Sequence, residues 1–119
     1  MNNRSLTAPS PETTAFDIEA DFLSAMGNAK RLHILHVLTE GEVSVSDLAE
    51  EVGLSQSSTS QHLAILREQG LVQTRRAAQT IFYSLQSGTA RTMLDTLADI
   101  FGSRRRSPAE RVQAGRLTK

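Results

Sequence analysis

The segment LSQSSTSQHLAILREQGLV, residues 54–72, is polar in its first half and apolar in its second. Ser55 is a favourable helix N-cap because its hydroxyl can accept a backbone N–H, and Gly70 is a typical helix stop. We therefore expect a helix from Ser55 to about Gln69. At about 100° per residue, one side of this helix collects Thr59, Leu63 and Leu66, with His62 at its border, and that side should face the core.

The outward side of the same helix carries small and amide-bearing residues and no Asp or Glu: Ser57, Ser60, Gln61 and Ala64, with Gln56 on the first turn. Glutamine can pair with N6 and N7 of adenine, and serine reaches phosphates or base edges. Acidic residues there would be repelled by DNA phosphates. The surface therefore suits insertion into the major groove, and the alternative is an ordinary solvated helix face.

The neighbouring segments predict a helix-turn-helix followed by a hairpin. Ser44 opens a short helix, VSDLAEEV, with Asp47 in the position of a capping-box partner, and Gly53 closes it. Two β-prone runs, LVQTRR and TIFYSL, are separated by residues 77–79, where glycine is absent and the turn signal is weak. This order of elements is typical of a winged helix.

Apolar residues at helical spacing predict further helices over residues 15–26 and 90–101. Asn28 caps another, AKRLHILHVL, which we expect Gly41 to end. Residues 1–14 and the basic segment 103–119 have the composition of flexible arms. The predicted fold class is mainly α with a β-hairpin, a winged helix-turn-helix domain of order ααααββα over residues 15–102.

The amino-acid composition limits the classes of protein to which this chain can belong. The chain has 119 residues, of which 39% are hydrophobic, so its core is marginal alone and a shared dimer core would stabilise it. There is no cysteine, which excludes disulfides and thiolate metal sites and suits a reducing cytosol. Neither a membrane span nor a signal peptide is visible, so we expect a cytoplasmic, nucleoid-associated protein.

The net charge is zero, yet the charges are unevenly distributed along the chain. Residues 1–60 hold three Lys/Arg and nine Asp/Glu, whereas residues 61–119 hold ten and four. A basic face is therefore compatible with a neutral protein, and the alternative is that these residues merely solvate the end of the chain. The sequence contains neither a glycine-rich phosphate loop nor a Ser/His/Asp set that would indicate an enzyme. The serious rival is a winged helix that docks on another protein through residues 56–61.

The segments NAKRLHILHVL (28–38), VSVSDLAEEVGLSQSSTSQHLAILREQGLV (43–72) and RRAAQTIFYSL (75–85) resemble the arsenical-resistance repressor (ArsR) family of bacterial winged-helix dimers. The resemblance covers about residues 15–102. It implies a transcription repressor that binds an inverted-repeat operator in double-stranded DNA as a homodimer, formed by the first and last helices.

Three sets of residues are expected to carry this function. Base contacts are expected from Gln56, Ser57, Ser60 and Gln61. Backbone contacts are expected from Ser55, Ser58, Arg67, Arg75, Arg76 and Gln79. Dimer contacts are expected from Ile18, Phe22, Met93, Leu94, Leu97 and Phe101.

Many members of the family release DNA when a metal binds, but their ligands are missing here. One common site has Cys-x-Cys-Asp in the third helix, where this chain has Ser44, Val45, Ser46 and Asp47. The other uses Asp and His at the start of the last helix and two late ligands, and the corresponding residues are Ser87, Thr89, Ile100 and Ser103. Serine hydroxyls replace thiolates poorly toward soft metals.

His33 and His36, three apart on the second helix, are the one remaining metal-like pair, and a surface role is the simpler reading. For His62 we expect a hydrogen bond beneath the recognition helix rather than a metal. We expect no cofactor, and the identity of any small-molecule effector stays open.

Overall fold

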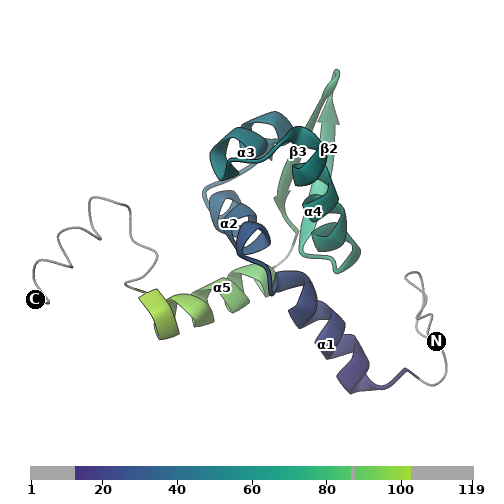
Figure 1. Cartoon of the computed structure of the whole chain (residues 1–119), viewed down its shortest axis with the longest axis vertical. Helices are drawn as coiled ribbons and strands as arrows, with labels where there is room; N and C mark the ends of the chain where they lie inside the picture. The colour runs from purple at the N-terminus through teal and green to yellow at the C-terminus, as the bar shows by residue number, and fades with distance from the viewer. Residues whose placement is uncertain (1–12, 87, 103–119) are drawn as a thin grey trace, which may run out of the picture.

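The computed structural model describes residues 13–86 and 88–102 (Figure 1). Their helices and strands are α1 (Ala15–Met26), α2 (Ala29–Leu38), β1 (Val43–Ser44), α3 (Val45–Val52), α4 (Gln56–Glu68), β2 (Val72–Ala77), β3 (Thr80–Leu85) and α5 (Gly88–Phe101). The predicted fold class is confirmed: α2 spans the expected AKRLHILHVL and ends just before Gly41, whereas α5 begins at Gly88 rather than at Ala90. Most of the predicted arms, residues 1–12 and 103–119, lie outside the described residues.

Side-chain caps fix where the helices begin. Thr14 Oγ1 accepts the Asp17 N–H while the Asp17 carboxylate accepts the Thr14 N–H, which is a complete capping box at the start of α1. Asn28 Oδ1 accepts two backbone N–H groups at the start of α2. Ser44 and Ser55 each accept one at the starts of α3 and α4, as predicted.

The sheet is antiparallel, with strand order β1–β3–β2. Strand β1 is only two residues long and was not predicted from the sequence. The hairpin register runs from Val72 opposite Leu85 to Ala77 opposite Thr80, so β2 includes Ala77 and the turn is shorter than predicted. Ala78 begins the turn with φ 56°, a conformation that normally favours glycine.

The core lies between α2, α3, α4, the base of the hairpin and the start of α5. Its buried members are Ala25, Met26, Ile34, Leu35, Leu38, Leu48, Val52, Leu63, Leu66, Leu71, Val72, Ala90 and Leu94. Leu94, expected at the dimer interface, is 4% exposed and belongs to the core of its own protomer, so little of its side chain is available to a partner. Phe22 and Met93 are half-buried and pack against the same core.

Helices α1 and α5 lie at the end of the molecule opposite the tip of the hairpin (Figure 1). Both keep large apolar side chains exposed in the protomer. On α1 the exposed fraction is 80% for Phe16, 50% for Ile18 and 55% for Leu23, and on α5 it is 64% for Ile100 and 45% for Phe101. Within residues 13–86 and 88–102, no helix is both long and apolar enough to cross a membrane.

Candidate nucleic-acid interface

The outer face of α4 is a polar surface held in place by a buried apolar face. Thr59, Leu63 and Leu66 are fully buried, as the sequence predicts. Thr59 Oγ1 donates to the Ser55 carbonyl at 2.8 Å, so the one buried hydroxyl on this face is satisfied. These contacts fix the rotation of α4 about its own axis. They leave exposed Ser55, Gln56, Ser57, Ser60, Gln61 and Ala64.

The first turn of α4 presents its polar groups together. Ser55 Oγ accepts the Ser58 N–H at 3.0 Å, and Ser58 itself is half-buried. From Ser55 to Arg67 the sequence has no acidic residue, and the first acid, Glu68, ends the helix. The N-terminal turn also carries the positive end of the helix dipole. This surface can accept a polyanion without charge repulsion from its own side chains.

Arg31, on α2, joins the end of α1 to α4. Its Nε donates to the Ala25 carbonyl at 2.5 Å and its Nη2 to the Ser24 carbonyl at 3.3 Å, which caps the last turn of α1. Its Nη1 lies 3.2 Å from His62 Nδ1 on α4. Because arginine only donates, the ring nitrogen is the acceptor and the proton of a neutral His62 is on Nε2. The hydrogen bond expected of His62 is present.

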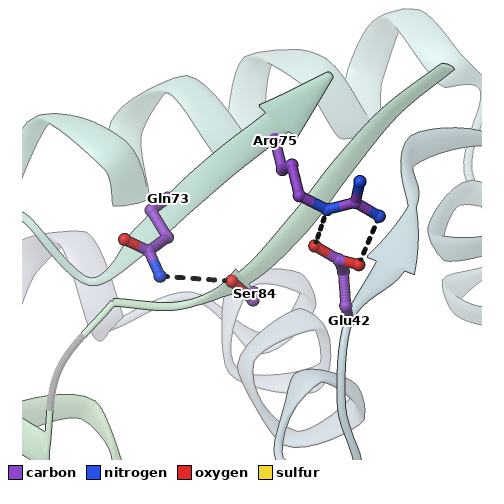
Figure 2. Close-up of polar contacts among 4 residues, drawn as sticks. All are labelled: Glu42, Gln73, Arg75 and Ser84. Atoms are coloured by element: carbon purple, nitrogen blue, oxygen red, sulfur yellow. Dashed lines mark hydrogen bonds and ion pairs between the residues drawn. The ribbon is translucent and has the colours of Figure 1, made fainter. Parts of the chain in front are cut away.

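The other predicted backbone-contact residues lie in the last turn of α4 and on the hairpin. Arg67, Arg76 and Gln79 are exposed. Side chains alternate along a strand, so Arg75 and Arg76 extend from opposite faces of the hairpin. Arg75 shares its face with Gln73, whose Nε2 donates to Ser84 Oγ at 3.5 Å on the neighbouring strand (Figure 2).

Arg75 is also engaged by the protein itself. Figure 2 shows its guanidinium reaching across β3 to Glu42, which directly precedes β1. Nε and Nη2 donate to the two carboxylate oxygens at 2.9 and 2.8 Å, and the guanidinium carbon lies 4.9 Å from the centre of the Phe82 ring. These hydrogen bonds, with the arginine charge, lower the pKa of Glu42 below its ordinary value, and the same hydrogen bonds raise the pKa of Arg75.

The positions that correspond to the family's metal ligands have structural roles or lie outside the described residues. Ser44 is 8% exposed and caps α3. Ile100 has a 64% exposed aliphatic side chain, and the predicted positions 87 and 103 are not among the described residues. His33 and His36 are exposed on α2. In the described part of the chain, no three His, Asp or Glu side chains gather closely enough to hold a metal ion.

Glu42 and Arg31 are the polar partners that sequence reasoning missed. Glu42 reaches Arg75 only because β1 pairs with β3, and that strand is too short to leave a periodic signal. Arg31 follows an N-cap and looks like an ordinary residue of a solvated first turn. No local pattern indicates either partnership.

Comparisons with known proteins agree with this geometry. The family model of bacterial regulatory proteins of the arsR family matches residues 28–74. The nodulation protein NolR of Rhizobium meliloti is 56% identical over 86 residues, which are 72% of this chain and 70% of the relative.

Two solved structures have a similar fold. The crystal structure of NolR from Sinorhizobium fredii has a TM-score of 0.72 and 52% identity, and covers 81% of this chain and 97% of that one. A homodimeric winged helix-turn-helix DNA-binding domain from Mycobacterium bovis, solved by NMR, has a TM-score of 0.66 and 25% identity. The match covers 82% of this chain and 98% of that domain. With a polar recognition helix, a hairpin wing and relatives of this kind, the chain belongs to the arsR family of bacterial regulatory proteins and is a DNA-binding transcription regulator rather than an enzyme.

Proposed function

We propose that the chain binds an inverted-repeat operator as a homodimer and places one α4 helix in each of two successive major grooves. The observation that carries this proposal is the exposed surface of α4, which combines serine and glutamine side chains with a complete absence of acidic residues from Ser55 to Arg67. Glutamine and serine are suited to base edges. The base-contacting residues are Gln56, Ser57, Ser60 and Gln61.

Residues around this surface contact the DNA backbone. Ser55 and Ser58 lie at the N-terminal turn of α4, where hydroxyl and backbone N–H groups suit phosphate oxygens. Arg67 follows at the other end of the helix, and the wing adds further contacts from Arg75, Arg76 and Gln79. Arginines on opposite faces of a hairpin suit the two backbones that border one groove.

The dimer forms through α1 and α5, as in the sequence-based expectation. Phe16, Ile18, Leu23 and Ile100 expose apolar surface at one end of the protomer, and such surface is usually covered in a soluble protein. Phe101 is 45% exposed and Phe22, Met93 and Leu97 are half-buried, and all four extend the same apolar region. A two-fold symmetric pairing covers this region on both copies and imposes two-fold symmetry on the operator.

A dimer bound over a promoter excludes the polymerase, and we assign the chain a repressor's role in the nucleoid. Ser44 and Ser46 stand where relatives have metal-binding cysteines, so soft metals have no site at α3. The fraction of operator bound is instead set by protein concentration, by competition at promoters or by an organic ligand. Residues 15–102 carry both the DNA-binding and the dimerisation surfaces.

Selection of binding sites from genomic DNA with the purified chain, followed by footprinting, tests this proposal. We expect one palindromic motif with half-site centres about 34 Å apart, the spacing of one helical turn. A single asymmetric half-site would refute the dimer arrangement. Absence of specific DNA binding, together with salt-independent affinity for a protein, would instead favour the protein-docking role of residues 56–61.

A further inference from the structure

The ion pair between Arg75 and Glu42 is formed at the surface that is proposed to contact DNA. The side chain of Arg75 is 57% exposed and that of Glu42 is 34% exposed. The guanidinium starts on the edge strand β2, passes over Phe82 on β3 and meets the carboxylate just before β1. It is therefore folded back over the sheet (Figure 2).

The carboxylate uses the same donors that a phosphate would use. Glu42 takes the Nε and Nη2 edge of the guanidinium in a bidentate pair. Arginine binds phosphate oxygens with the same planar fork, so one edge cannot serve both anions at the same time. Binding of a phosphate on this edge requires release of Glu42.

The pair is not needed to hold the fold together. Exposed ion pairs contribute little to stability. Backbone pairing of Val43 with Tyr83 and of Ser44 with Phe82 already fixes the segment after Glu42 against the sheet. The position of this carboxylate therefore has its largest consequence for what Arg75 can bind.

We propose that Glu42 is an internal competitor of DNA phosphate, so that binding by the wing is an exchange in which Arg75 leaves a carboxylate for a phosphate. This inference rests on the proposed function, because it needs Arg75 to contact the DNA backbone. Glu42 thereby lowers operator affinity and is a positioning residue for the wing in the DNA-free state.

The test is a double-mutant cycle with Glu42→Gln, Arg75→Ala and their combination, measured on the selected operator over a series of salt concentrations. Glu40→Gln is the matched control, because Glu40 is exposed in the same loop and makes no ion pair among the described residues. Loss of a surface ion pair should raise affinity about 2- to 5-fold per half-site in Glu42→Gln relative to Glu40→Gln. The gain should vanish when Arg75 is alanine.

The salt dependence shows where Arg75 lies in the complex. If the exchange takes place, Arg75→Ala reduces the slope of log K against log salt by about 0.9 per half-site, both in the wild-type background and in the Glu42→Gln background. A slope that changes only in the Glu42→Gln background means that Arg75 stays on Glu42 in the complex, which overturns the exchange.

Three other outcomes also overturn it. If Glu42→Gln and Glu40→Gln raise operator affinity equally, or if the gain in affinity persists with Arg75→Ala, Glu42 acts only through its negative charge and not through Arg75. If Arg75→Ala changes nothing in either background while the operator is still bound specifically, this inference fails and the rest of the proposed function stands. Glu42→Ala is the second variant if Glu42→Gln is poorly folded by circular dichroism.

Discussion

Substitution of Ile100 by aspartate should break the dimer without unfolding the protomer. Ile100 is 64% exposed in α5, so the isolated protomer loses little when it is replaced, within about 0.5 kcal/mol for a surface change. The same substitution at Leu94, which is 4% exposed, would place a carboxylate in the core and unfold the chain. Ile100 therefore separates association from folding.

The size of the effect follows from the exposed fraction. Complete burial of an isoleucine contributes about 1.5–3 kcal/mol, and 64% of that is about 1–2 kcal/mol for each copy. A symmetric interface contains the residue twice, so the apolar loss alone is about 2–4 kcal/mol. That loss raises the dimer dissociation constant at least about 30-fold, and an unpaired buried carboxylate adds to it.

Sedimentation over a range of protein concentrations measures this constant, and circular dichroism confirms that the fold is retained. Thr92→Asp is the matched control, because it adds the same charge to α5 at an exposed position. A folded Ile100→Asp protein with an unchanged dissociation constant would show that this part of α5 is not an interface. If Thr92→Asp weakens the dimer as much as Ile100→Asp does, the added charge on α5, and not the loss of apolar contact, is the cause.

Three further measurements follow from the same surfaces. Gln56→Ala should lower the binding free energy by about 1–3 kcal/mol through the loss of discrimination at one base position per half-site, whereas Arg76→Ala should weaken binding to all operator variants alike. If both variants weaken binding uniformly across the operator variants, Gln56 is a positioning residue. Operator affinity should be unaffected by Zn(II), Ni(II) and arsenite because serines occupy the thiolate positions, and a Zn(II) effect that disappears in the double variant His33→Ala/His36→Ala would contradict this. The hydrogen bonds and charge of Arg75 lower the pKa of Glu42. The small contribution of this exposed ion pair to stability is therefore present at neutral pH and lost as the pH falls through that pKa. Urea midpoints of wild type and Glu42→Gln should differ slightly at pH 7 and converge in acid, and a difference that persists in acid would exclude the charge as its cause.

The caps, helix bounds and burial of α4 could be predicted because they depend on neighbours within about four residues. Ser55 caps α4, Thr59 and Leu63 are buried, and Gln56 and Gln61 are exposed, all as the pattern predicts. A helical period distinguishes two faces of one helix. It carries no information on which distant residue will meet either face.

The polar partners could not be predicted for that reason. Glu42 and Arg75 are 33 residues apart, and Arg31 and His62 are 31 residues apart. The apolar stripe of α5 presented a related difficulty. The helical period of α5 includes both Leu94, which packs into the core of the protomer, and Ile100, which remains exposed. Periodicity alone does not show which edge of a wide apolar face will be covered by the same chain.

The guanidinium of Arg31 contacts the last carbonyls of α1 and His62 of α4, so it connects the proposed dimer interface to the proposed recognition helix. If α1 is held by the partner protomer, each recognition helix is tied to the two-fold axis and has little freedom to shift along the DNA. One inserted base pair between the half-sites displaces the second groove by about 3.4 Å and turns it by about 34° around the duplex. Operators for this chain should therefore be uniform in spacing even where their base sequences diverge, and a promoter could escape regulation by a single insertion at its centre of symmetry.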